Sequence, residues 1–333
     1  MTIHATDVVI VGGGMVGGAL ALGLAQQGFT VTVIEKNAPP AFDASSPPDV
    51  RISAISASSV GLLRGLGVWD SVRKMRAHAY RQLETWEWES AHVVFNAAEL
   101  KLPELGYMVE NNVLQLALWQ ALEAHERISL RVGISLQAMR REEMYTSLTL
   151  TDGSQIDARL VVGADGASSQ VRQLAGIGIH AWQYQQSCML ISVQCAGDPG
   201  DSTWQQFTPA GPRAFLPLFD HWASLVWYDA PARIRQLQGM SMAQLQQEIT
   251  RHFPSRLGEV TPLSAGAFPL TRRHALQYVK PGLALVGDAA HTIHPLAGQG
   301  VNLGYRDVDA LLDILGRAKA VSYTHLRAHE TDQ

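Results

Sequence analysis

The chain has 333 residues, of which 47% are hydrophobic and 17% charged, with a net charge of −4 at pH 7 and a pI near 6.3. This composition is that of a globular protein with room for two domains or one large α/β unit, and it excludes the strongly basic surface that nucleic-acid binding requires. The two cysteines, Cys188 and Cys195, fit no metal or redox spacing, so we expect two buried thiols in a reducing, cytoplasmic compartment. No signal peptide is recognisable and no apolar run approaches the ~18 residues of a membrane span, while a peripheral membrane contact stays open.

The stretch from Asp7 to Lys36 predicts a strand, a glycine turn, a helix and a second strand. Residues 8–11 are a continuous β-branched run, typical of a strand that is buried on both faces. Apolar residues continue as a helix that Gly28 is placed to end, and residues 30–34 form the second strand with Glu35 at its tip.

The turn has the GxGxxG pattern, with Gly12, Gly14 and Gly17 at the three glycine positions. Gly12 permits a tight turn, Gly14 lets a pyrophosphate approach the backbone, and Gly17 allows the helix to pack closely on the strand. Glu35 lies 21 residues after Gly14, near the ~20 expected for the carboxylate that binds an adenosine ribose. An acidic residue there favours FAD or NAD; the alternative is a glycine-rich turn without a ligand.

Residues 38–180 continue with the elements of an α/β fold. A Pro/Ser/Ala-rich loop comes first, and the apolar residues of 111–124 recur at helical spacing. The other predicted elements are a helix over 57–66 and strands within 82–95 and over 128–132, 147–151 and 160–162.

From about residue 181 short strands separated by turn residues indicate an antiparallel sheet. The predicted strands are 188–194, 203–207, 214–219 and 224–228, followed by a helix over 242–253. Residues 266–270 lead back to the first domain, where a buried strand over 283–286 and a helix over 300–315 are predicted.

The predicted division of the chain is discontinuous. The cofactor domain is expected from residues 1–75, 97–180 and 267–320, and the substrate domain from residues 76–96 and 181–266. Residues 321–333 lack apolar periodicity, so we expect the helix to stop after Ala320 and the remainder to be a foreign-looking, irregular and dispensable tail.

A second motif, GADGASSQVR, runs from Gly163 to Arg172, where a buried strand ends and a helix begins. Asp165 and Ser168 suit N-capping of that helix. The alternative interpretation is a plain strand–helix turn.

A third motif, GDAAHTIHP, starts at Gly287 and is followed by Gly298-Gln299-Gly300. Asp288 at a strand tip can accept hydrogen bonds from a polyol, and the glycine pair opens a helix whose N-terminus can face an anion. The alternative is a capped loop.

Together the three motifs, in this order, resemble the flavin-dependent aromatic hydroxylases, the single-component FAD monooxygenases, from Thr6 to about Ala320. Within that family the chain is most similar to the hydroxylases of ubiquinone biosynthesis, on the segments PDVRISAI (48–55), WEWE (86–89), GYMVEN (106–111) and HPLAGQG (294–300). The resemblance implies an α/β, p-hydroxybenzoate hydroxylase-like fold: a Rossmann-like FAD-binding domain with an interleaved antiparallel-sheet substrate domain.

The resemblance also implies a set of FAD-binding residues. The adenosine and pyrophosphate part would be held by Gly12, Gly14, Gly17 and Glu35. Further contacts would come from Arg51, Gln115, Asp165 and Asp288, and the flavin ring would be bordered by Pro295, Gly298, Gln299 and Gly300. Asp165 belongs to the motif that the family links to the reduced nicotinamide as well as to FAD.

The implied activity is the hydroxylation of a prenylated benzoquinol ring, with NAD(P)H and O2 as co-substrates and a flavin C4a-hydroperoxide as the oxygen donor. The expected partners are the quinol and, peripherally, the inner face of the membrane or a biosynthetic complex. Alternatives are a prenyl reductase, a halogenase, for which WxWxIP would be expected where WEWE stands, or a non-catalytic FAD-binding scaffold. A plain NAD dehydrogenase is disfavoured by the second and third motifs.

His291 and His294 are spaced like metal ligands, but no carboxylate or thiol cluster accompanies them, so we expect no metal. They are interpreted as structural residues near the flavin, with a proton-relay role for His294 as a hypothesis. Five aromatic residues are candidates either for a hydrophobic substrate pocket or for the core of the sheet: Trp204, Phe215, Phe219, Trp227 and Tyr228.

Overall fold

The computed structural model describes residues 4–88 and 90–331. Its first sheet has a parallel centre in the order β18, β11, β1, β2, β8, with β17 antiparallel at one edge and the β10–β9 hairpin attached to β11. The strands are β1 (His4–Val11), β2 (Val31–Glu35), β8 (Ile128–Val132), β9 (Leu136–Arg141), β10 (Thr146–Leu150), β11 (Gln155–Gly163), β17 (Val279–Lys280) and β18 (Leu283–Leu285).

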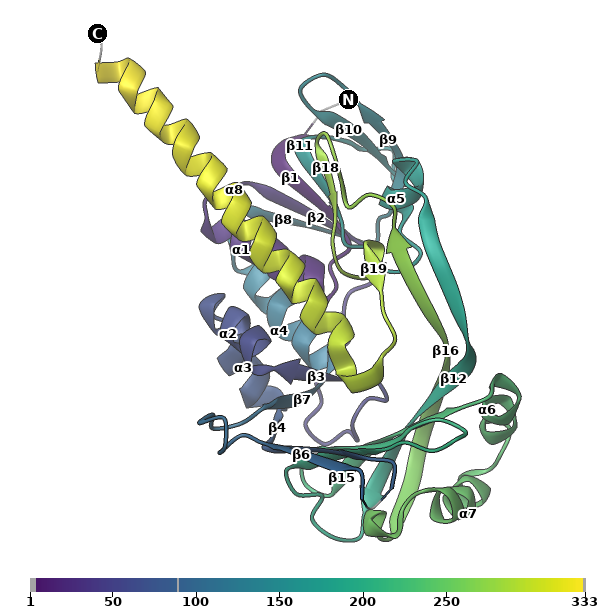
Figure 1. The fold of residues 1–333 in the computed structure, drawn as a ribbon. Coiled ribbons are helices and arrows are strands. Elements are labelled where there is room, and N and C mark those ends of the chain that lie inside the picture. Colours follow the sequence, from purple (N-terminus) through teal and green to yellow (C-terminus); the bar gives the residue numbers. More distant parts are fainter. Residues whose placement is uncertain (1–3, 89, 332–333) are drawn as a thin grey trace.

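Helices cover one face of this sheet, as Figure 1 shows. They are α1 (Met15–Gln26), α4 (Asn111–Glu123) and α8 (Gln299–Thr331), with α2 (Ala57–Gly65) and α3 (Trp69–Met75) beside them. Val8 and Ile10 of β1 face these helices, whereas Val9 and Val11 face a second core that includes residues of β9, β10 and α5 (Gln170–Leu174). Burial on both faces explains why β1 is apolar without alternation.

The second sheet is almost entirely antiparallel, in the order β19, β16, β12, β15, β14, β13, β5, β6. Its members are β5 (Gln82–Trp86), β6 (His92–Asn96), β12 (Ile179–Cys195), β13 (Ser202–Gln206), β14 (Arg213–Pro217), β15 (Trp222–Asp229), β16 (Val260–Ala275) and β19 (His291–Thr292). The helices α6 (Pro231–Gln238) and α7 (Met242–His252) pack on one of its faces.

A small three-stranded sheet contains β3 (Ile52–Ser56), β7 (Gly106–Glu110) and β4 (His78–Tyr80). Three short 3₁₀ turns complete the described elements: η1 (Ser255–Leu257), η2 (Gly287–Ala289) and η3 (Leu296–Gly298).

Most predicted elements are confirmed within a few residues, and the α/β class with a second, antiparallel sheet is confirmed. The strands predicted at 188–194 and 266–270 are parts of two much longer strands, β12 and β16, which join the two halves of the molecule in Figure 1. Both strands cross the predicted boundaries near residues 180 and 266; the division into domains stays a prediction. The sequence did not predict the helices α3 and α6, the strand β9, the small sheet of β3, β4 and β7, or the short strands β17 (Val279–Lys280) and β19 (His291–Thr292).

The predicted end of the last helix is wrong, because α8 continues past Ala320 to Thr331. Residues 321–331 contain neither glycine nor proline, so nothing in the local sequence stops a helix that is already nucleated.

The tail is still expected to be dispensable. In Figure 1 the last turns of α8 extend beyond the sheets and the other helices. Deletion of residues 321–333 should therefore leave the melting temperature unchanged in a thermal unfolding scan. A decrease of several degrees would show instead that the tail packs on the body of the protein.

Candidate functional site

The predicted cofactor residues collect at one edge of the parallel sheet. The glycine turn follows β1, Glu35 ends β2, Asp165 follows β11 and Asp288 follows β18. The carboxyl ends of neighbouring parallel strands lie at the same edge, which is where open α/β sheets bind their ligands.

The glycines of the turn serve two purposes. Gly12 has a φ of +107°, and a Cβ on it would lie 2.2 Å from the carbonyl oxygen of Ala164. A Cβ on Gly17 would lie 1.9 Å from the carbonyl oxygen of Gly12. Gly14, the N-cap of α1, has open space within 4 Å of its Cβ position. Gly12 and Gly17 are thus required by the fold, whereas Gly14 leaves the N-terminus of α1 open to an anion.

Gly13, between these positions, is held from both sides. Its N–H donates to Glu35 Oε2 (2.7 Å), and its carbonyl oxygen accepts from Gln115 Nε2 (3.0 Å) and Trp119 Nε1 (2.7 Å). Glu35 and Gln115 therefore fix the turn, and their predicted contacts with FAD stay predictions. Trp119 was not predicted, although it lies one helical turn after Gln115 on the same face of α4.

Asp165 caps α5. Its Oδ2 accepts from the N–H groups of Gln170 (2.7 Å) and Val171 (3.1 Å), and its Oδ1 accepts from the hydroxyl of Ser169. The N-cap residue is Ser169, so the prediction of Ser168 for this position is wrong. The cap interpretation of Asp165 is confirmed, and its role toward FAD or nicotinamide stays a prediction.

A buried arginine connects the second and third motifs. Arg172 donates to the carbonyl oxygens of Ala289 and Ala167, each at 2.8 Å. A guanidinium group offers five donors in a rigid plane, so one side chain can hold two loops at once.

The turn of the third motif is held by Asp307 of α8. Its Oδ2 accepts from the Gly287 N–H (2.8 Å) and lies 2.6 Å from His291 Nε2. This hydrogen bond raises the pKa of the mostly buried His291 above its usual value. Asp307 was not predicted, because no motif marks it.

Asp307→Asn gives a pH-dependent prediction. A raised histidine pKa adds stability that is complete below about pH 6.5, the unfolded value, and disappears as the pH rises through the folded value. The difference in melting temperature between wild type and Asp307→Asn should therefore be larger at about pH 6 than at about pH 9. An equal difference at both pH values would contradict the charged pair, since asparagine can still accept from Gly287.

Asp288 and Arg51 are brought together from distant parts of the sequence. Asp288 is accessible to solvent, yet the surrounding protein raises the pKa of its carboxyl, while the positive charges of His291, Arg51 and Arg273 act in the opposite direction. The Arg51 guanidinium also lies 4.5 Å from the centre of the Phe268 ring. The site therefore presents an exposed acceptor together with the exposed Arg51 and the partly exposed Arg273.

Asn302 shapes the loop of Pro295 to Gly300. Its Nδ2 donates to the carbonyl oxygens of Ala54 (2.8 Å) and Gly298 (3.0 Å), and its Oδ1 accepts from Ser56 and Ser59. Gly298 has a φ of +62°, whereas Gly300 has open space at its Cβ position. Gln299 opens α8 and, like Pro295, is exposed.

The aromatic candidates divide between the two faces of the second sheet. Trp204, Phe215 and Trp227 pack in the core with α6 and α7, as the core interpretation predicts, and Trp204 and Phe215 also line a cavity away from the predicted cofactor residues. Tyr228 lies on the opposite face, against the His294 ring, and Phe219 packs beside the small sheet. Successive residues of a strand point to opposite faces, which separates Trp227 from Tyr228.

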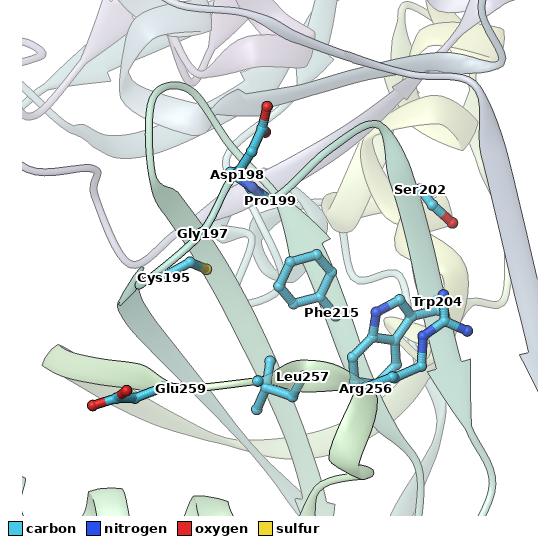
Figure 2. A pocket seen from close by; sticks show the side chains of 11 residues that line it. Cys195, Gly197, Asp198, Pro199, Ser202, Trp204, Phe215, Arg256, Leu257 and Glu259 are labelled. Carbon is cyan, nitrogen blue, oxygen red and sulfur yellow. The ribbon is translucent and has the colours of Figure 1, made fainter.

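The two cysteines lie in β12, and burial raises the pKa of Cys188 to about 12 and that of Cys195 to about 11. Cys195 also borders a half-open cavity of about 280 Å³, shown in Figure 2. None of the predicted cofactor residues lines it, and its Arg256 is held by both carboxylate oxygens of Glu84. This cavity is therefore separate from the cofactor site.

The residues that the structure describes contain no group of three or more His, Cys, Asp or Glu side chains that could hold a metal ion. None of the helices in this part of the chain is long and apolar enough to cross a membrane.

The residues at the sheet edge fit FAD. The open N-terminus of α1 suits a pyrophosphate, the exposed Asp288 carboxylate suits a polyol, and the open Gly300 position at the start of α8 suits the edge of a ring.

Known proteins resemble the chain along most of its length. The model of the FAD binding domain family matches residues 5–320. The chain is 76% identical over 320 residues to the 3-demethoxyubiquinol 3-hydroxylase of Escherichia coli K12, and this alignment covers 96% of this chain and 82% of that protein. It is 38% identical over 314 residues to the ubiquinone hydroxylase UbiL of Rhodospirillum rubrum, and this alignment covers 94% of this chain and 73% of that protein.

A solved structure shows the same fold. PqsL of Pseudomonas aeruginosa, described as a probable FAD-dependent monooxygenase, superposes with a TM-score of 0.82 at 22% identity, covering 95% of this chain and 87% of that one.

Proposed function

The chain belongs to the FAD-binding family that includes the hydroxylases of ubiquinone biosynthesis, and from this premise we propose that it hydroxylates the ring of a prenylated benzoquinol. It is an FAD-dependent monooxygenase with NAD(P)H and O2 as co-substrates. The observation that carries the substrate class is the 76% identity to a 3-demethoxyubiquinol 3-hydroxylase along 96% of the chain. We infer a quinol that lacks one ring methoxy group.

Bound FAD would supply the transfer of one oxygen atom from O2 to the ring, with electrons from NAD(P)H. The chain's own residues would hold and orient the cofactor and the substrate ring. Gly14 and α1 would bind the pyrophosphate, Asp288 the polyol chain, and the loop from Pro295 to Gly300 the edge of the flavin ring. The face of the second sheet that carries Tyr228 would exclude water from the ring.

An apolar substrate agrees with the charges of the segment from Trp204 to Tyr228. Arg213, the arginine of the segment from Trp204 to Tyr228, is buried and already paired with Asp229 at 3.0 Å. A substrate carboxylate would therefore find no unpaired arginine in this segment. A prenyl chain also resides in a membrane, so we infer a cytoplasmic enzyme that works at the inner face of the membrane or within a biosynthetic complex.

The test is paired measurement of NAD(P)H consumption, peroxide and hydroxylated product from the FAD-loaded enzyme. A prenylated, demethoxylated quinol should stimulate NAD(P)H oxidation and gain one hydroxyl group by mass spectrometry, whereas 4-hydroxybenzoate should do so poorly. Hydroxylation of 4-hydroxybenzoate alone would overturn the substrate class. NAD(P)H oxidation that gives a reduced product and no hydroxylated one would favour the reductase alternative, whereas the absence of any NAD(P)H oxidation would favour the non-catalytic scaffold.

A further inference from the structure

His294 is enclosed by two tyrosines of the second sheet. Its ring stacks on Tyr228, with centroids 5.4 Å apart and planes at 19°, and meets the edge of Tyr184 at 4.9 Å and 89°. Tyr228 belongs to β15 and Tyr184 to β12, while His294 belongs to the loop that leads into η3. These contacts hold the imidazole ring in one orientation at the junction of the two halves of the molecule.

An irregularity of β12 positions Tyr184. The pairing of β12 with β16 shifts between Gln183 and Ser187, so β12 contains extra residues at this point. Such a bulge turns a side chain out of the regular alternation, and bulges are common next to active sites. Here the bulge contains the residue that meets His294.

The hydrogen bonding of His294 leaves one nitrogen available. The N–H of Leu296 donates to Nδ1 at 3.1 Å, so Nδ1 is the acceptor nitrogen. Burial lowers the pKa of His294, which keeps the ring neutral at pH 7. A neutral imidazole carries its one proton on the other nitrogen, so Nε2–H is a donor, and the described residues provide it with no acceptor.

The half-buried His294 is also next to the cofactor residues. Pro295 follows it directly, and the loop then continues to Gly298 and Gly300. Tyr228, which stacks on His294, lies in a cluster of apolar residues on the face opposite α6 and α7: Cys188, Ala214, Val226 and Leu270, with Tyr184, Leu190 and Leu216 at its border. His294 thus holds a single oriented donor between this buried apolar cluster and the loop for the flavin ring.

We propose that His294 Nε2–H donates a hydrogen bond to one ring oxygen of the quinol and so orients the ring for hydroxylation. This inference rests on the proposed function and makes His294 a catalytic residue in the sense that it touches the substrate. A quinol ring that is held at one of its oxygens presents a defined carbon to the flavin, so the hydrogen bond fixes which ring carbon is hydroxylated.

The experiment compares three variants of the FAD-loaded enzyme. His294→Phe keeps a ring between the tyrosines but removes the donor. His294→Gln places an amide N–H near the position of Nε2–H. His180→Phe, at an exposed histidine of β12 outside the site, is the matched control.

His294→Phe should weaken quinol binding, measured by tryptophan fluorescence, and lower kcat/KM about tenfold, the usual effect of one lost hydrogen bond. It should also raise the peroxide formed per NAD(P)H consumed. His294→Gln should recover most of the loss, and His180→Phe should resemble wild type. FAD content should be the same in all four proteins. In ¹⁵N NMR of the wild type, the His294 signals should show protonation at Nε2 and shift when quinol is added.

A second comparison locates the contact. Two analogues of the quinol each have one ring hydroxyl replaced by hydrogen. For one of them the penalty of His294→Phe should disappear, because donor and acceptor are then both absent.

The proposal is overturned if His294→Phe binds and hydroxylates the quinol as the wild type does, or if His294→Gln is as defective as His294→Phe. It is also overturned if His294→Phe loses FAD, since His294 would then hold the cofactor. Failure of the wild type to turn over any prenylated quinol would instead remove the proposed function, and with it the ligand of His294.

Discussion

Gly14→Val is expected to produce a folded protein without flavin. The structure leaves the Cβ position of Gly14 open, since a Cβ placed there meets no protein atom within 4 Å beyond its chain neighbours. That open space lies at the N-terminus of α1, where a pyrophosphate would approach the backbone. Flavin content should fall by roughly tenfold or more, which corresponds to a loss of about 1.4 kcal/mol or more of binding free energy.

The matched comparison is Gly17→Ala, which adds a smaller side chain at a position where the structure leaves no space for one. Its Cβ would lie 1.9 Å from the carbonyl oxygen of Gly12, so β1 and α1 would have to separate and the protein should be destabilised or insoluble. The measurements are flavin absorbance per protein and circular dichroism. Wild-type flavin content in Gly14→Val would remove Gly14 from the phosphate site, and an equally unfolded Gly14→Val would show that the turn tolerates no side chain at all.

Arg76→Met is expected to lower stability more than most single substitutions. Arg76 and Glu110 form an ion pair at 3.3 Å in which the side chains are 7% and 8% exposed. Arg76 also donates to the carbonyl oxygens of Asp43, Ala44 and Ser46, and it thereby holds the loop that leads to Arg51. Removing one partner of a buried pair leaves the other charge unpaired and costs about 3–5 kcal/mol.

The loss should be visible as a lower midpoint in urea unfolding. The matched control is Arg81→Met, which breaks the exposed pair of Arg81 with Asp201, where the side chains are 52% and 48% exposed. Exposed pairs contribute about 0–1 kcal/mol, so this variant should stay close to wild type. If both variants unfold at the same urea concentration, the pair of Arg76 and Glu110 is not the anchor of the loop.

The sequence alone determined those elements whose form depends on residues that are close together in the chain. The order of strand, glycine turn and helix around Gly12 to Gly17 follows from local sterics, because the turn needs φ values and close approaches that other residues cannot provide. The helical spacing of α4 and the continuous apolar runs of β1 and β18 likewise identified these elements. The three motifs indicated the fold and the cofactor through their resemblance to the flavin-dependent aromatic hydroxylases.

The local sequence pattern did not predict the full length of the longest strands or the end of the last helix. The residues of β12 and β16 contain turn-like and polar positions, and only their pairing with each other extends them across the molecule. The end of α8 shows the converse: a sequence without apolar periodicity still forms helix because no residue in it breaks the helix.

Only the tertiary structure decided which residues meet at the site. Asp307 reaches Gly287 and His291 from α8, and Arg172 reaches Ala289 from α5. No motif marks either contact, because hydrogen bonds between distant segments depend on how whole elements pack.

The second sheet shows the same limit most clearly. The sequence indicated aromatic residues in this part of the chain, and their alternation along β15 then placed Trp227 in the core with α6 and α7 and Tyr228 against His294. Both faces of β15 are buried, and the packing of whole elements decides which layer covers each face, since a strand presents its two sets of side chains equally until other layers pack on them.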